Sequence, residues 1–447
     1  MSLPDGGGQG GTGGLARTMG LPALTIYGVG DMLGAGIYGL IGQAAGLMGT
    51  MVWLAFAGAM VAAALTGLSY ASLGSRYPRA AGAAFITQRA FGIAPLTYVF
   101  GLAVAASGLT SMATGAKTVA GYLQKAGLDL PAEWLAWGFL ALLTAVVLRG
   151  IRESTWMNAI CTAVELSGLL IVIAVGLPYW GRVDYFAAPA GVDGGGALLM
   201  LTLQGSVLTF FSFIGFEDML NVSEEVRDPE RTIPRALILA LIVATAVYMA
   251  VAITAVSVLP PAQLTASSAA LVDVVGAAAP WIPPGLFTGI GIFAVANTAL
   301  LNFIMGSRLL YGMSRQGLLP AALGVVHAGS RVPRRAALCL LGVVAGLVWI
   351  GDIKALAAAT SLLLLSAFVV VNLALLTLQR RPEEPKGAFE IPGIVPAGGA
   401  LVCLCLIGAR LADPKADPRA LLIAGGILAG AGALYAVLRP KEVAADV

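Results

Sequence analysis

Three carboxyl side chains stand in unusual places in this sequence. Asp31, Glu165 and Glu217 lie inside long apolar stretches, with Asp218 beside the last, and no Lys or Arg lies near the middle of those stretches. An ionisable group deep in an apolar medium costs at least about 2.5–3.5 kcal/mol, so each of them needs an explanation. A carboxyl group without a counter-charge in a low dielectric can take up a proton near neutral pH. Glu217, Glu165 and Asp31 are therefore candidate proton-coupling residues, although Asp31 and Asp218 are also explained as hydrogen-bonded structural acids.

Two of the apolar stretches contain features that break a helix. One has five glycines within twelve residues, at positions 28, 30, 34, 36 and 39, and the other contains residues 212–218, SFIGFED. Because Gly costs about 1 kcal/mol in a helix interior, such a cluster indicates an interruption. In a membrane, the exposed N–H and C=O groups of a broken helix must be buried in protein or line a cavity. Close helix packing through small residues is the alternative for the glycines. A dinucleotide-binding loop is excluded, because the spacing in residues 28–34 is one residue too long.

The composition defines the class of protein to which these stretches belong. Of the 447 residues, 58% are apolar and 11% are charged, whereas a soluble domain has about 45–50% and about 25%. The net charge is only +3, which gives no basic surface for nucleic acid. Cys403 and Cys405 form a C-x-C pair, but His327, the single histidine, falls in a polar loop. We therefore predict an integral membrane protein with no metal and no cofactor.

The apolar stretches predict about twelve membrane-spanning helices of roughly 20 residues each. Their expected ranges are 22–47, 51–74, 92–120, 132–149, 156–180, 197–221, 233–259, 284–307, 334–350, 354–378, 393–412 and 419–438. If the N-terminus lies inside, the loops and termini on that side hold 19 of the 26 Lys and Arg residues. This asymmetry predicts that both termini are cytoplasmic in the plasma (inner) membrane.

Four sequence motifs resemble those of the amino acid–polyamine–organocation transporter superfamily, and of bacterial amino acid permeases in particular. Residues 28–38 (GVGDMLGAGIY) are similar to its broken first helix, and residues 211–218 (FSFIGFED) with 221–234 (NVSEEVRDPERTIP) to its broken sixth helix and the following loop. Residues 77–82 (YPRAAG) and 307–320 (SRLLYGMSRQGLLP) are two further matches. Their order and spacing agree over nearly the whole chain.

The resemblance implies an all-α fold of two inverted five-helix repeats. It places the first repeat at 21–180, the second at 181–378 and two added helices at 379–438. The Gly-rich residues 1–20 predict a flexible cytoplasmic tail, and residues 439–447 are expected to form a second cytoplasmic tail. It also implies a site in which amides at the first break receive a substrate carboxylate and the second break receives its amine. The implied substrate-binding residues are Gly34, Ala35, Gly36, Ile37, Phe211, Ser212, Phe213, Ile214 and Phe216. The three phenylalanines are equally explained as lipid-facing or core aromatics.

The resemblance implies secondary active transport of amino acids by alternating access, with a proton as the expected coupling ion. Glu217 matches a family position that is often acidic and tied to proton dependence. Glu165 aligns with a position where some proton-coupled members have a lysine that stands in for a bound sodium ion. Because this chain has an acid there, the lysine mechanism does not carry over. Sodium binding is not excluded. A polyamine or cationic amine carrier and an exchanger remain alternatives. A membrane-embedded enzyme is a remote one, because no catalytic set of residues assembles. The expected partners are the small-molecule substrate, the proton and the lipid bilayer.

Overall fold

The computed structural model describes residues 19–77, 82–149, 155–189, 191–192, 194–315, 318–327, 332–414 and 416–438. Most of the two predicted tails, together with residues 78–81 and 316–317 of the family motifs, lies outside the described residues. The described part is all-helical, as predicted, and its strand-like feature is an isolated parallel bridge between Met19 and Val226.

The α-helices are α1 (Leu21–Met32), α2 (Ala35–Met48), α3 (Val52–Arg76), α4 (Ala83–Phe91), α5 (Ala94–Lys125), α6 (Ala132–Arg149), α7 (Thr155–Gly176), α8 (Gly195–Phe210), α9 (Pro229–Val258), α10 (Pro261–Ala266), α11 (Ala270–Ala278), α12 (Pro284–Arg315), α13 (Arg334–Ile350), α14 (Ile353–Gln379), α15 (Ile394–Leu411) and α16 (Pro418–Leu438). Short 3₁₀ helices are η1 (Gly49–Met51), η2 (Leu177–Tyr179), η3 (Phe211–Phe213), η4 (Phe216–Leu220), η5 (Ser223–Glu225) and η6 (Ala321–Gly324).

Each of the twelve predicted stretches overlaps helices of the structure. The first corresponds to α1 and α2 in series, and the sixth to α8, η3 and η4. In the described part of the chain, ten helical segments are long and apolar enough to cross a membrane, and the first of them, Ala35–Arg76, contains both α2 and α3. The additional apolar helix α13 has 17 residues. The prediction of an all-α, multi-pass membrane protein is therefore confirmed.

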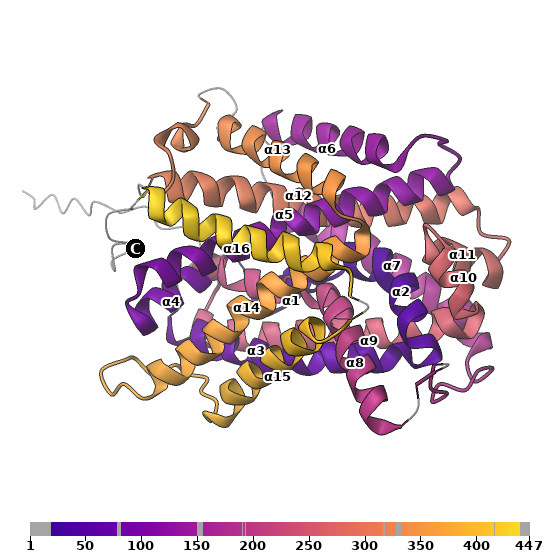
Figure 1. The fold of residues 1–447 in the computed structure, drawn as a ribbon, viewed down its shortest axis with the longest axis horizontal. Coiled ribbons are helices and arrows are strands. Elements are labelled where there is room, and N and C mark those ends of the chain that lie inside the picture. Colours follow the sequence, from indigo (N-terminus) through magenta and orange to yellow (C-terminus); the bar gives the residue numbers. More distant parts are fainter. Residues whose placement is uncertain are drawn as a thin grey trace, which may run out of the picture.

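The long helices run side by side along the longest axis of the molecule (Figure 1). The short helix α4 lies near one end, and α10 and α11 lie near the other, which we call the α4 end and the α10–α11 end. Helix α3 packs against α8 and α9, and α5 packs against α12 and α14. These helices enclose the interrupted segments, so the breaks are buried in protein rather than exposed to lipid.

A buried amide joins α3 to α14 in the core. The side chain of Asn372 donates to Thr66 Oγ1 at 3.0 Å and accepts from Ser69 Oγ at 2.7 Å. Its Nδ2 also donates to the Phe368 carbonyl at 2.8 Å. Lipid tails are as apolar as the helix surfaces, so the hydrophobic effect does little to bring membrane helices together. Interhelical hydrogen bonds of this kind therefore help to hold them in contact.

Candidate functional site

The first interruption lies between α1 and α2. Leu33 is extended (ψ 118°), and α2 starts at Ala35 with Gly34 before it. The first backbone hydrogen bond of α2 runs from Tyr38 N to Gly34 O at 3.1 Å. The amides at the start of a helix have no partner inside it. The predicted anion-binding residues, Gly34 to Ile37, are thus buried at a helix N-terminus, as expected from the glycine cluster.

The second interruption follows α8. Residues of η3 continue the chain, Ile214 is extended (ψ 138°), and Gly215 adopts a φ of +123°, which L side chains rarely adopt. A Cβ at Gly215 would lie 2.8 Å from the Asp31 carbonyl carbon. Gly215 is therefore required both by its backbone conformation and by the close approach of α1.

The two interruptions touch each other. A Cβ at Gly36 would lie 2.5 Å from Ser212 Cα, so the backbone of α2 passes directly over η3. The Ser212 hydroxyl is buried there and has no hydrogen-bond partner among the described groups. Amide donors of α2 and carbonyl acceptors of the second break, both predicted from sequence, are thus brought to one place. Binding of an anionic and a cationic group at this place stays a prediction.

A tyrosine that sequence reasoning missed connects both breaks. The hydroxyl of Tyr248 on α9 lies 2.6 Å from Met32 O and 2.6 Å from Ser212 O, and it donates to these carbonyls. The two carbonyls share this one proton in a bifurcated hydrogen bond. A buried Tyr hydroxyl usually has a hydrogen-bond partner. The position of Tyr248 inside an apolar stretch could therefore have indicated a polar contact there.

Two of the three predicted carboxylates gather at the second break. Glu217 is 7% exposed and accepts a hydrogen bond from Gly215 N at 3.0 Å. Asp31 packs against the same Gly215. Asp218, which follows Glu217, accepts from Asn221 Nδ2 at 2.9 Å. Asp31 and Glu217 therefore approach each other across one glycine, which no local sequence pattern indicates.

Glu165 occupies a different and closed environment. Its side chain is 0% exposed, and its Oε1 accepts from Asn297 Nδ2 on α12 at 2.9 Å. The hydroxyl of Tyr38 on α2 donates to the backbone oxygen of Glu165 at 2.7 Å. The second carboxylate oxygen is buried without a partner among the described groups. Glu165 thus joins α7 to α2 and α12 but does not reach the cavity described next.

A cavity of about 970 Å³ leads from the α4 end to the second break. Its lining includes Ile214 and Glu217 from the break, Ser107 on α5 and Asn302 on α12. Asn302 donates through Nδ2 to Thr298 O at 3.0 Å, and a Cβ on Gly108 across from it would lie 3.1 Å from its Oδ1. The sequence indicates no residue of α5 as part of the cavity lining, because a single sequence does not show which side chains of distant helices converge.

The phenylalanines predicted to bind substrate pack into the helix core. The ring of Phe213 contacts Tyr248 with centroids 5.2 Å apart, and Phe216 contacts Tyr70 and Phe368 at 5.8 and 5.3 Å. Phe211 is also buried, and none of the three is among the residues that line the cavity. Their contact with a substrate stays a prediction.

The fold and the paired interruptions are those of a multi-pass membrane transport protein. Residues 19–414 match the family model described as amino acid permease, and the chain belongs to this family. The resemblance seen in the sequence is therefore confirmed over nearly the whole chain.

Similar proteins include transporters with different named substrates. An uncharacterized transporter of Mycobacterium bovis is 33% identical over 95% of this chain and 92% of its own length. A methylthioribose transporter of Bacillus subtilis is 29% identical over 87% of each chain. A branched-chain amino acid permease of Bacillus subtilis is 26% identical over 88% of each chain.

Proposed function

We propose that this protein is a secondary active transporter that carries amino acids by proton symport, alternating its access around the two helix interruptions. The observation that carries the proposal is the contact between Gly36 and Ser212, which places the free amides of α2 beside the carbonyls of the second break. A zwitterion presents one carboxylate and one ammonium, one for each of these two sets of groups. A neutral solute uses neither set fully.

The substrate carboxylate would bind the amides of Gly34, Ala35, Gly36 and Ile37, where N–H donors and the partial positive charge of α2 favour an anion. The substrate ammonium would face the carbonyls of residues 211–214 and the unpartnered Ser212 hydroxyl. Met32 O and Ser212 O share the single Tyr248 proton, and the second lone pair of each carbonyl could accept from an ammonium donor.

Glu217 is the proposed proton carrier. Its carboxylate borders both the cavity and the break, so a proton taken up there is next to the substrate. Around it lie Asp218, which follows it in the chain, Asp31, which contacts the same Gly215, and Tyr70 from α3, and none of these three is basic. A bound proton would relieve the repulsion among these acids, which links protonation to the geometry of the break. Glu165 is the second candidate, because one of its oxygens is buried without a partner.

The proposed state is inward-facing in a plasma membrane. Arg76, Arg89 and Arg381 lie near the α4 end, and the positive-inside asymmetry of the sequence places this end in the cytoplasm. The cavity extends from this end to the second break. Opening on the other face would then require the two proposed repeats, 21–180 and 181–378, to move relative to each other.

A second candidate is a carrier, or exchanger, of polyamines or other cationic amines. It is favoured by the acids that line the cavity at the second break, Glu217 and Asp218. The arginines at the mouth are engaged elsewhere, since Arg89 pairs with Glu384 at 3.0 Å and Arg381 donates to the Ala90 carbonyl at 2.7 Å. The part of the cavity at the second break therefore favours positive charge.

The test is uptake by the purified protein in liposomes. The vesicles carry an inward proton gradient in sodium-free buffer, and the external solution contains labelled amino acids, a diamine or methylthioribose in separate arms. Accumulation of amino acids that collapses with a protonophore supports proton symport. Uptake only when the lumen contains amino acid indicates exchange. Uptake of the diamine alone replaces the proposal with the second candidate, and uptake of methylthioribose alone contradicts both.

A further inference from the structure

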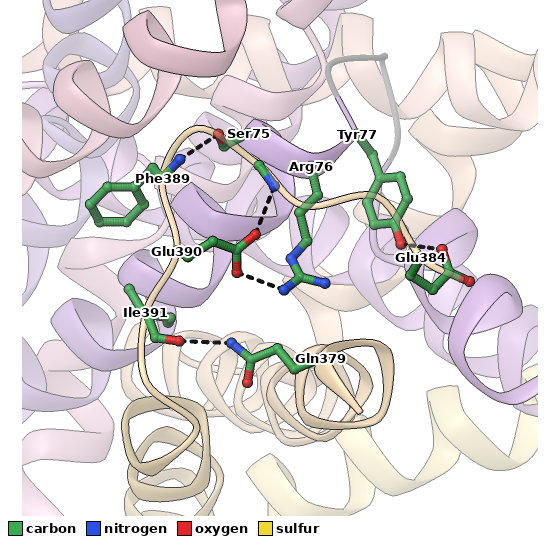
Figure 2. A network of polar contacts seen from close by, with 9 residues as sticks. Ser75, Arg76, Tyr77, Gln379, Glu384, Phe389, Glu390 and Ile391 are labelled. Atoms are coloured by element: carbon green, nitrogen blue, oxygen red, sulfur yellow. Dashed lines mark hydrogen bonds and ion pairs between the residues drawn. The ribbon is translucent and has the colours of Figure 1, made fainter. Parts of the chain in front are cut away.

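The loop between α14 and α15, residues 380–393, lies across the end of α3 and beside α4 (Figure 2). We call this loop the strap. Its two ends are held together by Gln379, whose Nε2 donates to Ile391 O at 2.8 Å. All of its polar contacts with α3 and α4 join residues about 300 positions apart in the chain.

The strap is fixed to the end of α3 by charge and by close backbone contact. Arg76 pairs with Glu390 at 2.6 Å, and Ser75 Oγ accepts from Phe389 N at 2.9 Å. Glu390 also accepts from Gly387 N at 2.7 Å, which closes a turn inside the strap. A Cβ on Gly387 would lie 2.9 Å from Arg76 N, so only glycine permits this approach.

The strap is fixed to α4 through Glu384 and Arg381. Glu384, 8% exposed, accepts from Tyr77 Oη at 2.7 Å and from Arg89 Nε at 3.0 Å. Its hydrogen bond and negative charge raise the pKa of the Arg89 guanidinium, and burial raises the pKa of Tyr77. Arg381 donates to the carbonyls of Arg89 and Ala90 at 3.0 and 2.7 Å. A cation at these last carbonyls stabilises the C-terminus of α4.

Helix α4 needs such support because it has nine residues, and isolated helices shorter than about 12–15 residues are marginal. The same helix forms the rim of the cavity through Ala83, Phe85 and Arg89, and Glu384 of the strap lines the cavity beside it. The strap thus connects the rim to α3 and α14, which lie in the helix core.

We propose that the strap holds α4 as a fixed rim of the cavity, with Glu384 as the positioning residue through which Tyr77 and Arg89 are joined to it. Closure of the cavity at the α4 end then comes from the other lining segments, which include Glu217 of η4, while α4 stays attached to α3. The part of this proposal that concerns transport rests on the proposed function. The attachment of α4 does not.

The attachment is tested by hydrogen–deuterium exchange of the full chain in nanodiscs. In Glu384→Ala, the amides of residues 83–91 should exchange at least about tenfold faster, because α4 loses its link to Tyr77 and the strap. Glu384→Gln keeps an acceptor for both donors and should show a smaller increase, so it separates local release from failure to fold. The matched control is Glu133→Gln, which removes a different ion pair, with Lys117, near the α10–α11 end. Unchanged exchange of α4 in Glu384→Ala, with unchanged exchange in α9 and α14, overturns the proposal.

A second measurement separates positioning from general stability. In liposomes, Glu384→Ala should lower kcat per folded transporter by about tenfold while KM changes less than about twofold, since the rim lies apart from the breaks. Glu384→Gln should recover most of kcat. A raised KM with unchanged kcat would place Glu384 at the substrate and contradict a positioning role. If the parent protein moves no amino acid, the proposed function fails. The hydrogen–deuterium exchange of α4 still tests the attachment of α4 independently.

Discussion

Gly36 and Ser212 lie in direct contact although they are far apart in the chain, and this contact joins the two helix interruptions. Replacement of Gly36 by leucine should weaken substrate binding by about a hundredfold, because the side chain must displace the Ser212 backbone beside the α2 amides. Isothermal calorimetry or a scintillation proximity assay with the transported substrate measures this. The control is Gly342→Leu on α13, where a Cβ meets no atom within 4 Å. Unchanged affinity in Gly36→Leu would remove the substrate from the first break.

Glu217→Gln should separate proton coupling from substrate binding. The amide cannot release a proton, so accumulation driven by a pH gradient should fall by at least about tenfold. Exchange of labelled for unlabelled substrate should remain within about threefold of the parent, because exchange needs no net proton movement. Glu165→Gln is the comparison variant. If the Glu217→Gln variant accumulates substrate like the parent protein and the Glu165→Gln variant does not, Glu165 is the proton carrier.

The sequence predicted the helices and the breaks well because their signals are local. Apolar length marks each span, and glycines beside Asp31 and Glu217 mark both interruptions. The boundaries were less accurate: α9 begins at Pro229, four residues before the predicted position 233, since the helix continues into polar sequence.

The contacts between helices could not be predicted in this way. The bond from Tyr248 to Met32 O, like the place of Ser107 in the cavity lining, depends on how each helix is rotated and shifted against its neighbours. Hydropathy shows which segments enter the membrane, but almost every face of these helices is apolar. The pairing of Glu384 with Arg89 is equally hidden, because loop charges have many alternative partners.

Tyr248→Phe tests whether one hydroxyl controls both breaks. The ring contacts with Phe56 and Phe213 remain, while the hydrogen bonds to Met32 O and Ser212 O are lost. The two breaks then lose the side chain that links them, and we expect the less fixed site to bind substrate about tenfold more weakly. Tyr179→Phe in η2 is the control, because its ring can still contact Arg182. A tighter Kd in Tyr248→Phe would show instead that the hydroxyl competes with the substrate for these carbonyls.

Asn372→Leu tests the amide that joins α3 to α14. The substitution removes the hydrogen bonds that join Asn372 to Thr66 and Ser69. Ser69 keeps its bond to Leu65 O, and Thr66 keeps its contact with Cys403 Sγ. We expect a loss of about 1–2 kcal/mol in stability. The measurement is thermal unfolding in detergent, followed by tryptophan fluorescence, with Ser366→Ala as control. Ser366 on α14 donates within its own helix, to Leu362 O, so removing its hydroxyl breaks no contact between helices. Equal Tm values for both variants would mean that packing alone holds α3 against α14. A lower Tm in Asn372→Leu would assign this part of the core to the hydrogen bonds.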